Sequence, residues 1–334
     1  ACSVYPMTMF LAGKTVPFGA LAGVASALEV RRRGLVRRLL LAMLEELRVQ
    51  GIGWCLEYPF GPGFYGRMGW GSIPNGIMLD LPPAALLAGP VTGVRRLPLE
   101  ELPSFAAVHE QWAGNYSFAP TRLDDPRGSW DRLTDREWLE GEAHLYAYGD
   151  EGYVLIMLEQ EAGDIVVEVI DYAFGTPAAR EELLALLGSF TGQAKWVRLL
   201  VPPDDPLALD YLSRHARTGR SPLQARIVEL AAALASMTAD EEWSLTLALN
   251  DSLCAWNDGT YRIAAGPRGT DATPASAARP DVVVLVHALP MLLAGVPART
   301  LLAAGLAQGD PLDLERLASL ARGYTTFQPL ADSF

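Results

Sequence analysis

Apolar runs and one amphipathic segment alternate along the first 60 residues. Residues 3–11 and 19–30 are rich in small, β-branched and apolar side chains, which predicts two adjacent strands joined by a turn over Gly13–Pro17. Residues 33–49 repeat leucine and methionine at helical spacing, which predicts an amphipathic helix. Ile52–Tyr58 is apolar again and predicts another strand. The expected order is strand, strand, arginine-rich turn, helix, strand.

The rest of the chain predicts two further regions of mixed helices and strands. A Pro- and Gly-rich linker over Leu81–Gly93 precedes the first region, and a second boundary is expected near Arg217–Pro222. In the first region we expect a helix over 102–113, a hairpin of 143–158 and 164–173, a helix over 177–190 and a strand over 196–201. In the second we expect a helix over 224–236, strands over 244–249 and 260–265, a mobile loop over 266–280, a buried strand over 281–287, and helices over 297–308 and 313–321. The 334 residues suit two or three domains of α+β class.

Composition excludes several classes of protein. Half the residues are hydrophobic and a fifth are charged, which argues against disorder, collagen and coiled coil. No window approaches 18 uncharged apolar residues, so no membrane span is expected, and no signal peptide is visible. Cys2, Cys55 and Cys254 lack the spacing of a disulfide framework or a zinc cage, and the four histidines stand singly. We therefore expect no metal site and a cytoplasmic protein.

Charge is unevenly distributed along the chain. Residues 1–75 carry 8 basic and 4 acidic groups, whereas residues 76–334 carry 19 and 35, and the net charge is -12. The acidic remainder would repel nucleic acid and concentrate a cationic small substrate. Alternatively, the acidity only keeps the protein soluble.

The arginines of the string EVRRRGLVRRLL stand at the start of the predicted helix, where cations oppose the helix dipole. A bound phosphate would remove this conflict, and Gly34 would let it approach the free backbone N–H groups. The alternative is a solvated basic turn. The later string GPGFYG, at Gly61–Gly66, matches GxGxxG, but Gly69, Gly71 and Pro74 interrupt the helix that a dinucleotide fingerprint must open, so we reject a Rossmann fold.

Several strings together resemble one family. AGVASALEVRRRGLVRRLL, at Ala22–Leu40, is similar to motif A of the GNAT acetyltransferases, and FYGRMGWG, at Phe64–Gly71, resembles the tyrosine-containing motif of the enhanced intracellular survival (Eis) subgroup. EGYVL and VPPDDPL resemble the second GNAT-like domain of that subgroup, and LTLALNDSLCAWNDGTYRIAAG its sterol carrier protein-like domain. The resemblance implies an N-terminally incomplete GNAT domain at 1–80, a second GNAT-like domain at 81–218 and a sterol carrier protein-like α/β domain at 219–334.

The resemblance also implies site residues. Contacts to acetyl-CoA, the cosubstrate, are expected from Val24, Ala25, Ser26, Arg32, Arg33, Gly34, Leu35, Val36, Arg37, Phe60 and Gly61. Tyr65 falls on the general acid, and a phenol suits this role because it stays protonated at pH 7. The C-terminal carboxylate of Phe334 falls on the general base. The alternatives are a core aromatic at position 65 and a frayed tail at position 334.

The sequence thus predicts an acetyl-CoA-dependent N-acetyltransferase that acts on a cationic small molecule such as an aminoglycoside. The resemblance implies a homo-hexamer. Two other functions stay open at this point: a protein lysine acetyltransferase, and a lipid-binding protein with a decayed transferase domain. The resemblance implies a strand and two helices ahead of the strand that begins near Cys2, and we expect a truncated or renumbered sequence rather than an incomplete acceptor cleft.

Overall fold

The computed structural model describes residues 1–334 apart from 87–88, 124, 127, 136–142, 212–216, 221–222, 276–278 and 334. The chain divides into two compact units, each built from separate stretches of sequence. The first comprises residues 1–74 and 222–326, and the second comprises residues 75–221 and 327–333. The three-domain division at 80/81 and 218/219 stays a prediction.

The first unit opens with the predicted strands and helix. Strands β1 (Ser3–Leu11) and β2 (Lys14–Ala22) form an antiparallel hairpin, and helix α1 (Leu35–Val49) connects β2 to the parallel strand β3 (Trp54–Glu57). The predicted turn over 13–17 is too long, because pairing resumes at Lys14. The strand expected over 19–30 ends at Ala22, and only a short 3-10 helix, Leu28–Val30, follows before α1.

A strand from far along the chain completes this sheet. Strand β14 (Gln224–Ile227) pairs antiparallel with β3 and with the short strand β4 (Gly71–Ser72), giving the order β4-β14-β3-β2-β1. The helix expected over 224–236 is therefore wrong in its first half, and helix α7 spans only Leu230–Leu234. The buried face of α1 packs in the same core as Val228, Leu253 and Cys254, so local and distant segments share one interior.

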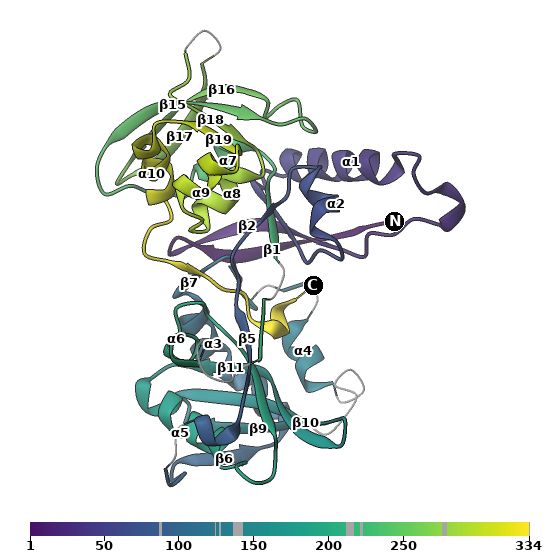
Figure 1. Ribbon diagram of the computed structural model, residues 1–334, viewed down its shortest axis with the longest axis vertical. Helices are drawn as coiled ribbons and strands as arrows, with labels where there is room; N and C mark the ends of the chain where they lie inside the picture. The colour runs from purple at the N-terminus through teal and green to yellow at the C-terminus, as the bar shows by residue number, and fades with distance from the viewer. Residues whose placement is uncertain are drawn as a thin grey trace. The chain divides into compact units, whose positions relative to one another are not determined.

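The rest of the first unit is a five-stranded sheet with helices. Its order is β17-β16-β15-β18-β19, from β15 (Trp243–Asn250), β16 (Gly259–Gly266), β17 (Gly269–Pro274), β18 (Val282–Leu285) and β19 (Ala307–Gly309). Helices α8 (Ala288–Leu293), α9 (Ala298–Ala303) and α10 (Pro311–Ser319) pack against one another, and α8 and α9 contact β18 and β19 (Figure 1). The loop expected over 266–280 contains β17, and the helix expected over 297–308 ends before β19.

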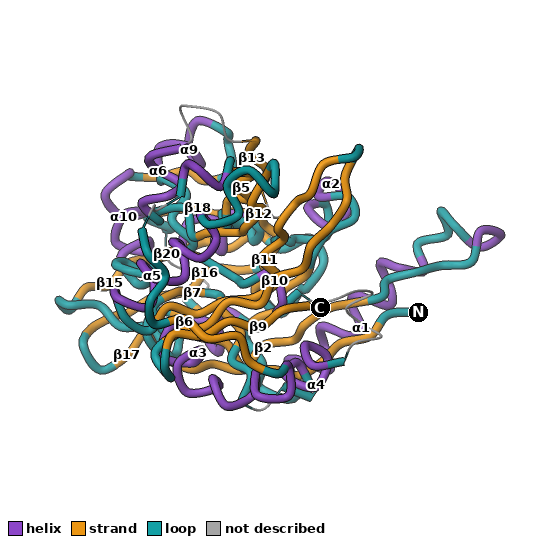
Figure 2. The backbone as a smooth tube through the Cα atoms, turned by 90° about the horizontal axis from the view of Figure 1, so that it is seen from below, coloured by secondary structure: helices purple, strands orange, loops and turns teal. Residues whose placement is uncertain are grey.

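The second unit holds a seven-stranded sheet of order β13-β5-β12-β11-β10-β9-β6. Its strands are β5 (Ile77–Leu81), β6 (Val94–Leu97), β9 (Ala143–Tyr148), β10 (Gly152–Glu161), β11 (Asp164–Phe174), β12 (Trp196–Val201) and β13 (Arg217–Arg220). The expected hairpin is in fact three antiparallel strands, β9, β10 and β11, which run side by side in Figure 2. β13 lies in the stretch 217–222, where a boundary was expected, and the division between the two units also falls in this stretch.

The second unit also contains helices. They are α3 (Ala106–Ala113), α4 (Ser129–Thr134), α5 (Pro177–Gly188) and α6 (Pro206–Tyr211), and a 3-10 helix, Leu99–Phe105, leads into α3. Of these, α3, α5 and α6 contact strands of the sheet. The helix predicted over 102–113 is thus part 3-10 and part α. The Thr176 side chain caps α5 by accepting a hydrogen bond from the Ala179 N–H, which explains the sharp start of that helix.

A buried polar network lies inside the second unit. The Arg122 guanidinium, 3% exposed, donates to Asp171 from Nη1 and Nη2 at 2.7 and 2.9 Å and to Asp332 from Nε at 2.5 Å. The Tyr153 hydroxyl also donates to Asp171, at 2.7 Å, and the Trp130 ring lies 4.7 Å from the guanidinium carbon. Because Asp332 belongs to the segment 327–333, this network ties that segment to the second unit.

Candidate functional site

The candidate site begins where two parallel strands of the first unit stop pairing. β2 and β3 stay in register from Phe18 opposite Trp54 to Leu21 opposite Glu57. Beyond that point the chain leaves β2 through Gly23, whose φ of 60° is in the left-handed region that favours glycine. The carboxyl ends of parallel strands in α/β folds are where ligands bind.

The amino end of α1 lies at the same place. Its N-cap is Gly34, with φ of 72°, and no side chain caps the helix. The first turn holds no acidic residue, so its free backbone N–H groups and the positive end of the dipole face no carboxylate of the helix itself. Arg32 also has a positive φ, 61°, a conformation that costs a non-glycine residue about 1–2 kcal/mol. Such strain is typical of functional turns.

These segments enclose a cavity of about 650 Å³. It is lined by Val24, Ala25, Ser26, Val30, Arg31, Arg32, Gly34, Leu35, Val36, Arg37, Phe60, Phe64 and Met68. Nine of the eleven residues predicted to contact acetyl-CoA are among these, and Arg33 and Gly61 are not. The roles of all eleven stay predictions, but the fold brings most of them to one surface.

The cavity wall is suited to an anion. Arg31 and Arg32 make no ion pair with another described residue, and Arg37 uses Nη2 to donate to the backbone carbonyl of Ser252 at 3.1 Å. The wall therefore combines guanidinium groups with a helix N-terminus, which is the arrangement that binds phosphate. Phe60 and Phe64 make the other side apolar. The residues present fit a ligand that has both a diphosphate and an apolar arm.

Sequence reasoning missed four lining residues. Arg31 was recognised in the motif but not assigned to the site, and Val30 lies beside it. Phe64 lies on helix α2 (Pro62–Gly66), and Met68 follows four residues later in the turn after that helix, so spacing close to one helical turn was the available signal. Apolar side chains occur both in cavity walls and in the protein core, so their character alone did not show that these two residues line a cavity.

Tyr65 is buried beside the cavity without lining it. Its side chain is 2% exposed, and its ring packs against Phe64 and Phe60 with centroid separations of 5.0 and 5.5 Å. Trp70 closes the other side at 6.0 Å. Burial raises the pKa of the phenol, and the nearby carboxyl of Glu57 adds to this effect. Tyr65 is thus a packed aromatic near a carboxyl, and it stays protonated at neutral pH.

Glu57 is a buried acidic residue, outside the cavity lining, that sequence reasoning did not single out. The side chain is 1% exposed at the last registered position of β3, and burial raises the pKa of its carboxyl to about 8, partly offset by the nearby hydroxyl of Tyr65. One acidic residue in an apolar strand, WCLE, was the available signal. Phe334, the predicted base, lies outside the described residues.

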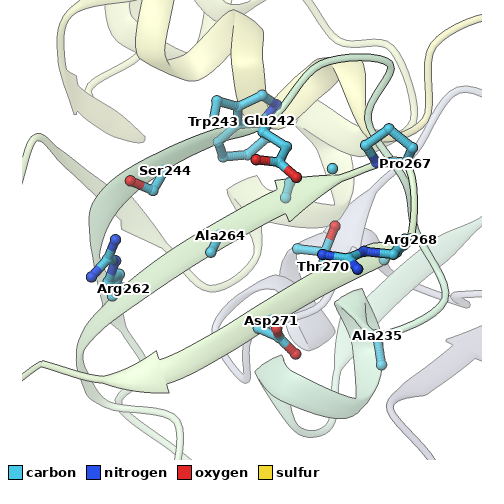
Figure 3. A pocket seen from close by; sticks show the side chains of 13 residues that line it. Ala235, Glu242, Trp243, Ser244, Arg262, Ala264, Pro267, Arg268, Thr270 and Asp271 are labelled. Carbon is cyan, nitrogen blue, oxygen red and sulfur yellow. The ribbon is translucent and has the colours of Figure 1, made fainter.

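A second cavity, of about 660 Å³, lies over β15, β16 and β17 (Figure 3). Charged side chains surround it, namely Glu242, Arg262, Arg268 and Asp271. The opposite face of the sheet is buried and filled by Leu245, Leu247 and Ile263. Because lipid pockets are predominantly apolar, this cavity does not favour a lipid-binding function.

The described residues contain neither a membrane-spanning helix nor a cluster of metal ligands. No helix there is long and apolar enough to cross a bilayer. No group of three or more His, Cys, Asp or Glu side chains in that part of the chain is arranged to hold a metal ion. All three cysteines are free thiols.

Family models match three consecutive segments of the chain. Residues 1–73 and 122–227 each match an acetyltransferase (GNAT) domain, and residues 228–330 match a sterol carrier protein domain. The α+β class, with two GNAT domains followed by a sterol carrier protein-like domain, is thereby confirmed. The second GNAT match, residues 122–227, includes β14. In the structure this strand pairs with β3 and β4, which belong to the first match.

Known proteins are similar to this chain in sequence or in fold. An uncharacterized N-acetyltransferase of Streptomyces avermitilis is 24% identical over 281 residues, covering 77% of this chain and 67% of the relative. The crystal structure of a GCN5-related N-acetyltransferase from Anabaena variabilis superposes with a TM-score of 0.88 at 20% identity, covering 100% of this chain and 86% of that one. Eis1 from Mycobacterium abscessus gives a TM-score of 0.79 at 21% identity, with coverage of 100% and 87%. At these identities the structural likenesses show the fold.

Proposed function

Because the chain is an N-acetyltransferase built on GNAT domains, we propose that it binds acetyl-CoA in the cavity at the start of α1 and transfers the acetyl group to an amine of a cationic small molecule of the aminoglycoside kind. The observation that carries the proposal is the cavity itself. It joins the carboxyl end of β2, an uncapped helix N-terminus and unpaired arginines at a single surface.

Each part of the wall has its own task in this proposal. Arg31 and Arg32, with the N–H groups that follow Gly34, hold the diphosphate, because its charge is complementary to theirs. Val24, Ala25 and Ser26 continue from β2 along the pantetheine arm. Bound acetyl-CoA supplies an activated acyl group as a thioester. Phe60 and Phe64 shield that arm from water, which strengthens electrostatic interactions nearby.

The transfer needs a proton donor and a proton acceptor. Tyr65 is the proposed donor to the leaving thiolate, and its raised pKa keeps the phenol protonated at neutral pH. The carboxylate of Phe334 is the proposed acceptor from the amine, following the family resemblance. An unperturbed α-carboxyl has a pKa near 3.5, so this role depends on its surroundings.

The proposed class of acceptor is inferred from the charge of the chain. Residues 76–334 carry 35 acidic against 19 basic groups, which favours a polycationic acceptor over an anionic one. A protein lysine is the second candidate, because it offers the same ammonium group. We further propose a cytoplasmic homo-hexamer, for which the free thiols and the resemblance are the supporting observations.

The test combines binding and turnover. Calorimetric titration measures the affinity of the protein for acetyl-CoA. The rate of thiol release with a panel of aminoglycosides, simple polyamines and lysine peptides shows which amines are acetylated. Tyr65→Phe is expected to lower kcat by about 10²-fold with acetyl-CoA affinity nearly unchanged. The matched variant Tyr5→Phe, on the exposed part of β1, is expected to behave as wild type. Absence of acetyl-CoA binding would refute the proposed function.

A further inference from the structure

A loop of the sterol carrier protein-like segment, residues 251–258, lies against the proposed acetyl-CoA site. It joins β15 to β16. The carbonyl oxygen of Ser252 in this loop accepts a hydrogen bond from Nη2 of Arg37 at 3.1 Å. Arg37 is in the first turn of α1 and lines the cavity. The two residues are 215 positions apart in the sequence, so only the folded chain brings them together.

The same loop packs along the rest of α1. Leu253 and Cys254 share one core with the buried face of the helix. In the last turn of α1, the guanidinium carbon of Arg48 lies 5.3 Å from the centre of the Trp256 ring. Loop and helix are therefore held together at the start, the middle and the end of α1. This packing fixes the backbone of the helix, and with it the amino end that faces the cavity, relative to the loop.

Asp251 sets the shape of the loop beside Ser252. Its carboxylate accepts hydrogen bonds from the N–H groups of Leu253 and Cys254, both at 3.0 Å, and from Nη2 of Arg226 at 2.9 and 2.8 Å. Asp251 is 4% exposed and Arg226 is 0% exposed, and charge-assisted hydrogen bonds are among the strong ones in proteins. Because these bonds hold the backbone on both sides of Ser252, they fix the direction of its carbonyl.

The far end of the loop is tied to the sheet that carries the cavity. Asn257, which is 0% exposed, donates from Nδ2 to the carbonyl oxygen of Val228 at 3.0 Å and accepts from the N–H of Leu230 at 3.1 Å. The indole Nε1 of Trp256 donates to the carbonyl of Val228 at 2.8 Å. Val228 directly follows β14, which pairs with β3. The loop is thus anchored to the first sheet as well as to α1.

We propose that Asp251 is a positioning residue of the acetyl-CoA site, which orients the Ser252 carbonyl so that this carbonyl holds the guanidinium of Arg37 at the cavity wall. The inference rests on the proposed function. A guanidinium has five N–H donors, so one bond to Ser252 leaves four for the diphosphate. A side chain that is already held in place loses less conformational entropy when the ligand binds. The sterol carrier protein-like segment thereby increases the affinity for acetyl-CoA without contacting it.

This assignment predicts a change in affinity rather than in chemistry. Asp251→Asn keeps the shape of the side chain but removes the charge that holds Arg226 and weakens the bonds to the loop backbone. The Kd for acetyl-CoA should rise about 3- to 10-fold, the effect of one side chain that is no longer held before binding. At saturating acetyl-CoA, kcat should change by less than about 2-fold. In an Arg37→Met background, Asp251→Asn should change the Kd by less than about 2-fold, because it acts through Arg37.

The experiment measures the Kd for acetyl-CoA by calorimetric titration and kcat by thiol release for wild type, Asp251→Asn, Arg37→Met and the double variant. Leu247→Ala is the matched control. It truncates a fully buried side chain of β15, so it lowers the stability of the same sheet, and it should leave the Kd unchanged. Circular dichroism and thermal unfolding show whether each variant is folded at the temperature of the titration.

A second variant loosens the loop from its surface. The carboxylate of Asp258, an exposed residue, accepts a hydrogen bond from the N–H of Asp251 at 3.0 Å. If Asp251→Asn does not fold, Asp258→Ala takes its place, since it removes this bond and leaves the buried pair with Arg226 intact. It should raise the Kd by about 2- to 3-fold where Arg37 is present and not in Arg37→Met.

The possible outcomes separate the two proposals. Wild-type protein that does not bind acetyl-CoA contradicts the proposed function and this inference with it. If the wild type binds acetyl-CoA and the loop variant has the same Kd, the role of Asp251 is overturned while the proposed function stands. An equal rise in Kd with and without Arg37, or the same rise in Leu247→Ala, shows a general loss of structure and also overturns that role.

Discussion

Arg122→Met removes a buried cation and leaves a side chain of similar length. The wild-type guanidinium is 3% exposed and donates to two carboxylates, Asp171 and Asp332, at 2.5 to 2.9 Å. Breaking a buried ion pair from one side typically costs 3–5 kcal/mol, because the remaining charge stays buried without compensation. We expect the free energy of unfolding of the second unit to fall by about this amount.

The loss should depend on pH with a definite sign. Burial by itself raises the pKa of Asp171, but Arg122 outweighs it, so the pKa is lowered overall. In the wild type this carboxylate stabilises the fold above its unfolded pKa of about 3.9, and the contribution is lost as the pH falls through the folded pKa. Without Arg122, burial dominates and the folded pKa rises above 3.9. The difference between variant and wild type should therefore be larger at pH 8 than at pH 4.5.

Hydrogen exchange followed by mass spectrometry, across a urea series, measures the free energy of unfolding of the second unit separately from that of the first. Peptides of β10 and β11 report on the network directly, because Tyr153 and Asp171 lie on these strands. Arg180→Met is the matched control. Its pair with Asp205 is also 2.9 Å long but partly exposed, so about 1 kcal/mol or less is expected. Equal losses for the two variants, or a loss for Arg122→Met independent of pH, would refute the reasoning.

Three further predictions concern the first unit and the chain end. Arg32→Glu should weaken acetyl-CoA binding in a titration at low salt by more than Arg33→Glu does, because only Arg32 lines the cavity; equal effects would contradict this geometry. A tag appended after Phe334 should abolish most acetyl transfer while Phe334→Leu retains it, and a fully active enzyme whose tag is intact by mass spectrometry would remove the carboxylate from the mechanism. Gly71→Ala should destabilise the first unit by about 1–3 kcal/mol in thermal unfolding, because a Cβ there would lie 2.0 Å from a backbone carbonyl oxygen. Gly63→Ala, with nothing within 4 Å, should be nearly neutral.

The sequence alone determined the elements whose signals are local. The helix predicted over 33–49 is observed at Leu35–Val49, and the strand predicted over 196–201 has the same bounds in the structure. The helix predicted over 177–190 also forms, at Pro177–Gly188. Helical spacing and apolar runs are set by neighbours within a turn or two, so they can be read without knowledge of the fold. The motif at the start of α1 was recognisable for the same reason.

Tertiary structure decided the elements whose partners are distant. Gln224–Ile227 continues into a helical pattern, yet it is a strand because β3 and β4 offer unpaired edges on both of its sides. Ile77–Leu81 follows the first GNAT match but pairs with β12 and β13 of the second unit. A short apolar segment has only a weak intrinsic preference for helix or strand. Its secondary structure therefore depends on whether the fold places it beside a strand with unpaired backbone groups.

The same distinction applies to the site. The arginines and glycine of the turn predict an anion site from about a dozen residues of sequence, because the conflict with the helix dipole is local. The burial of Glu57 near Tyr65 has no such signal. It exists because β3 ends where β2 diverges and because β14 brings Gln224 against the start of α2. Burial of a carboxyl, and hence its raised pKa, is a property of the surrounding strands, and only the folded chain determines it.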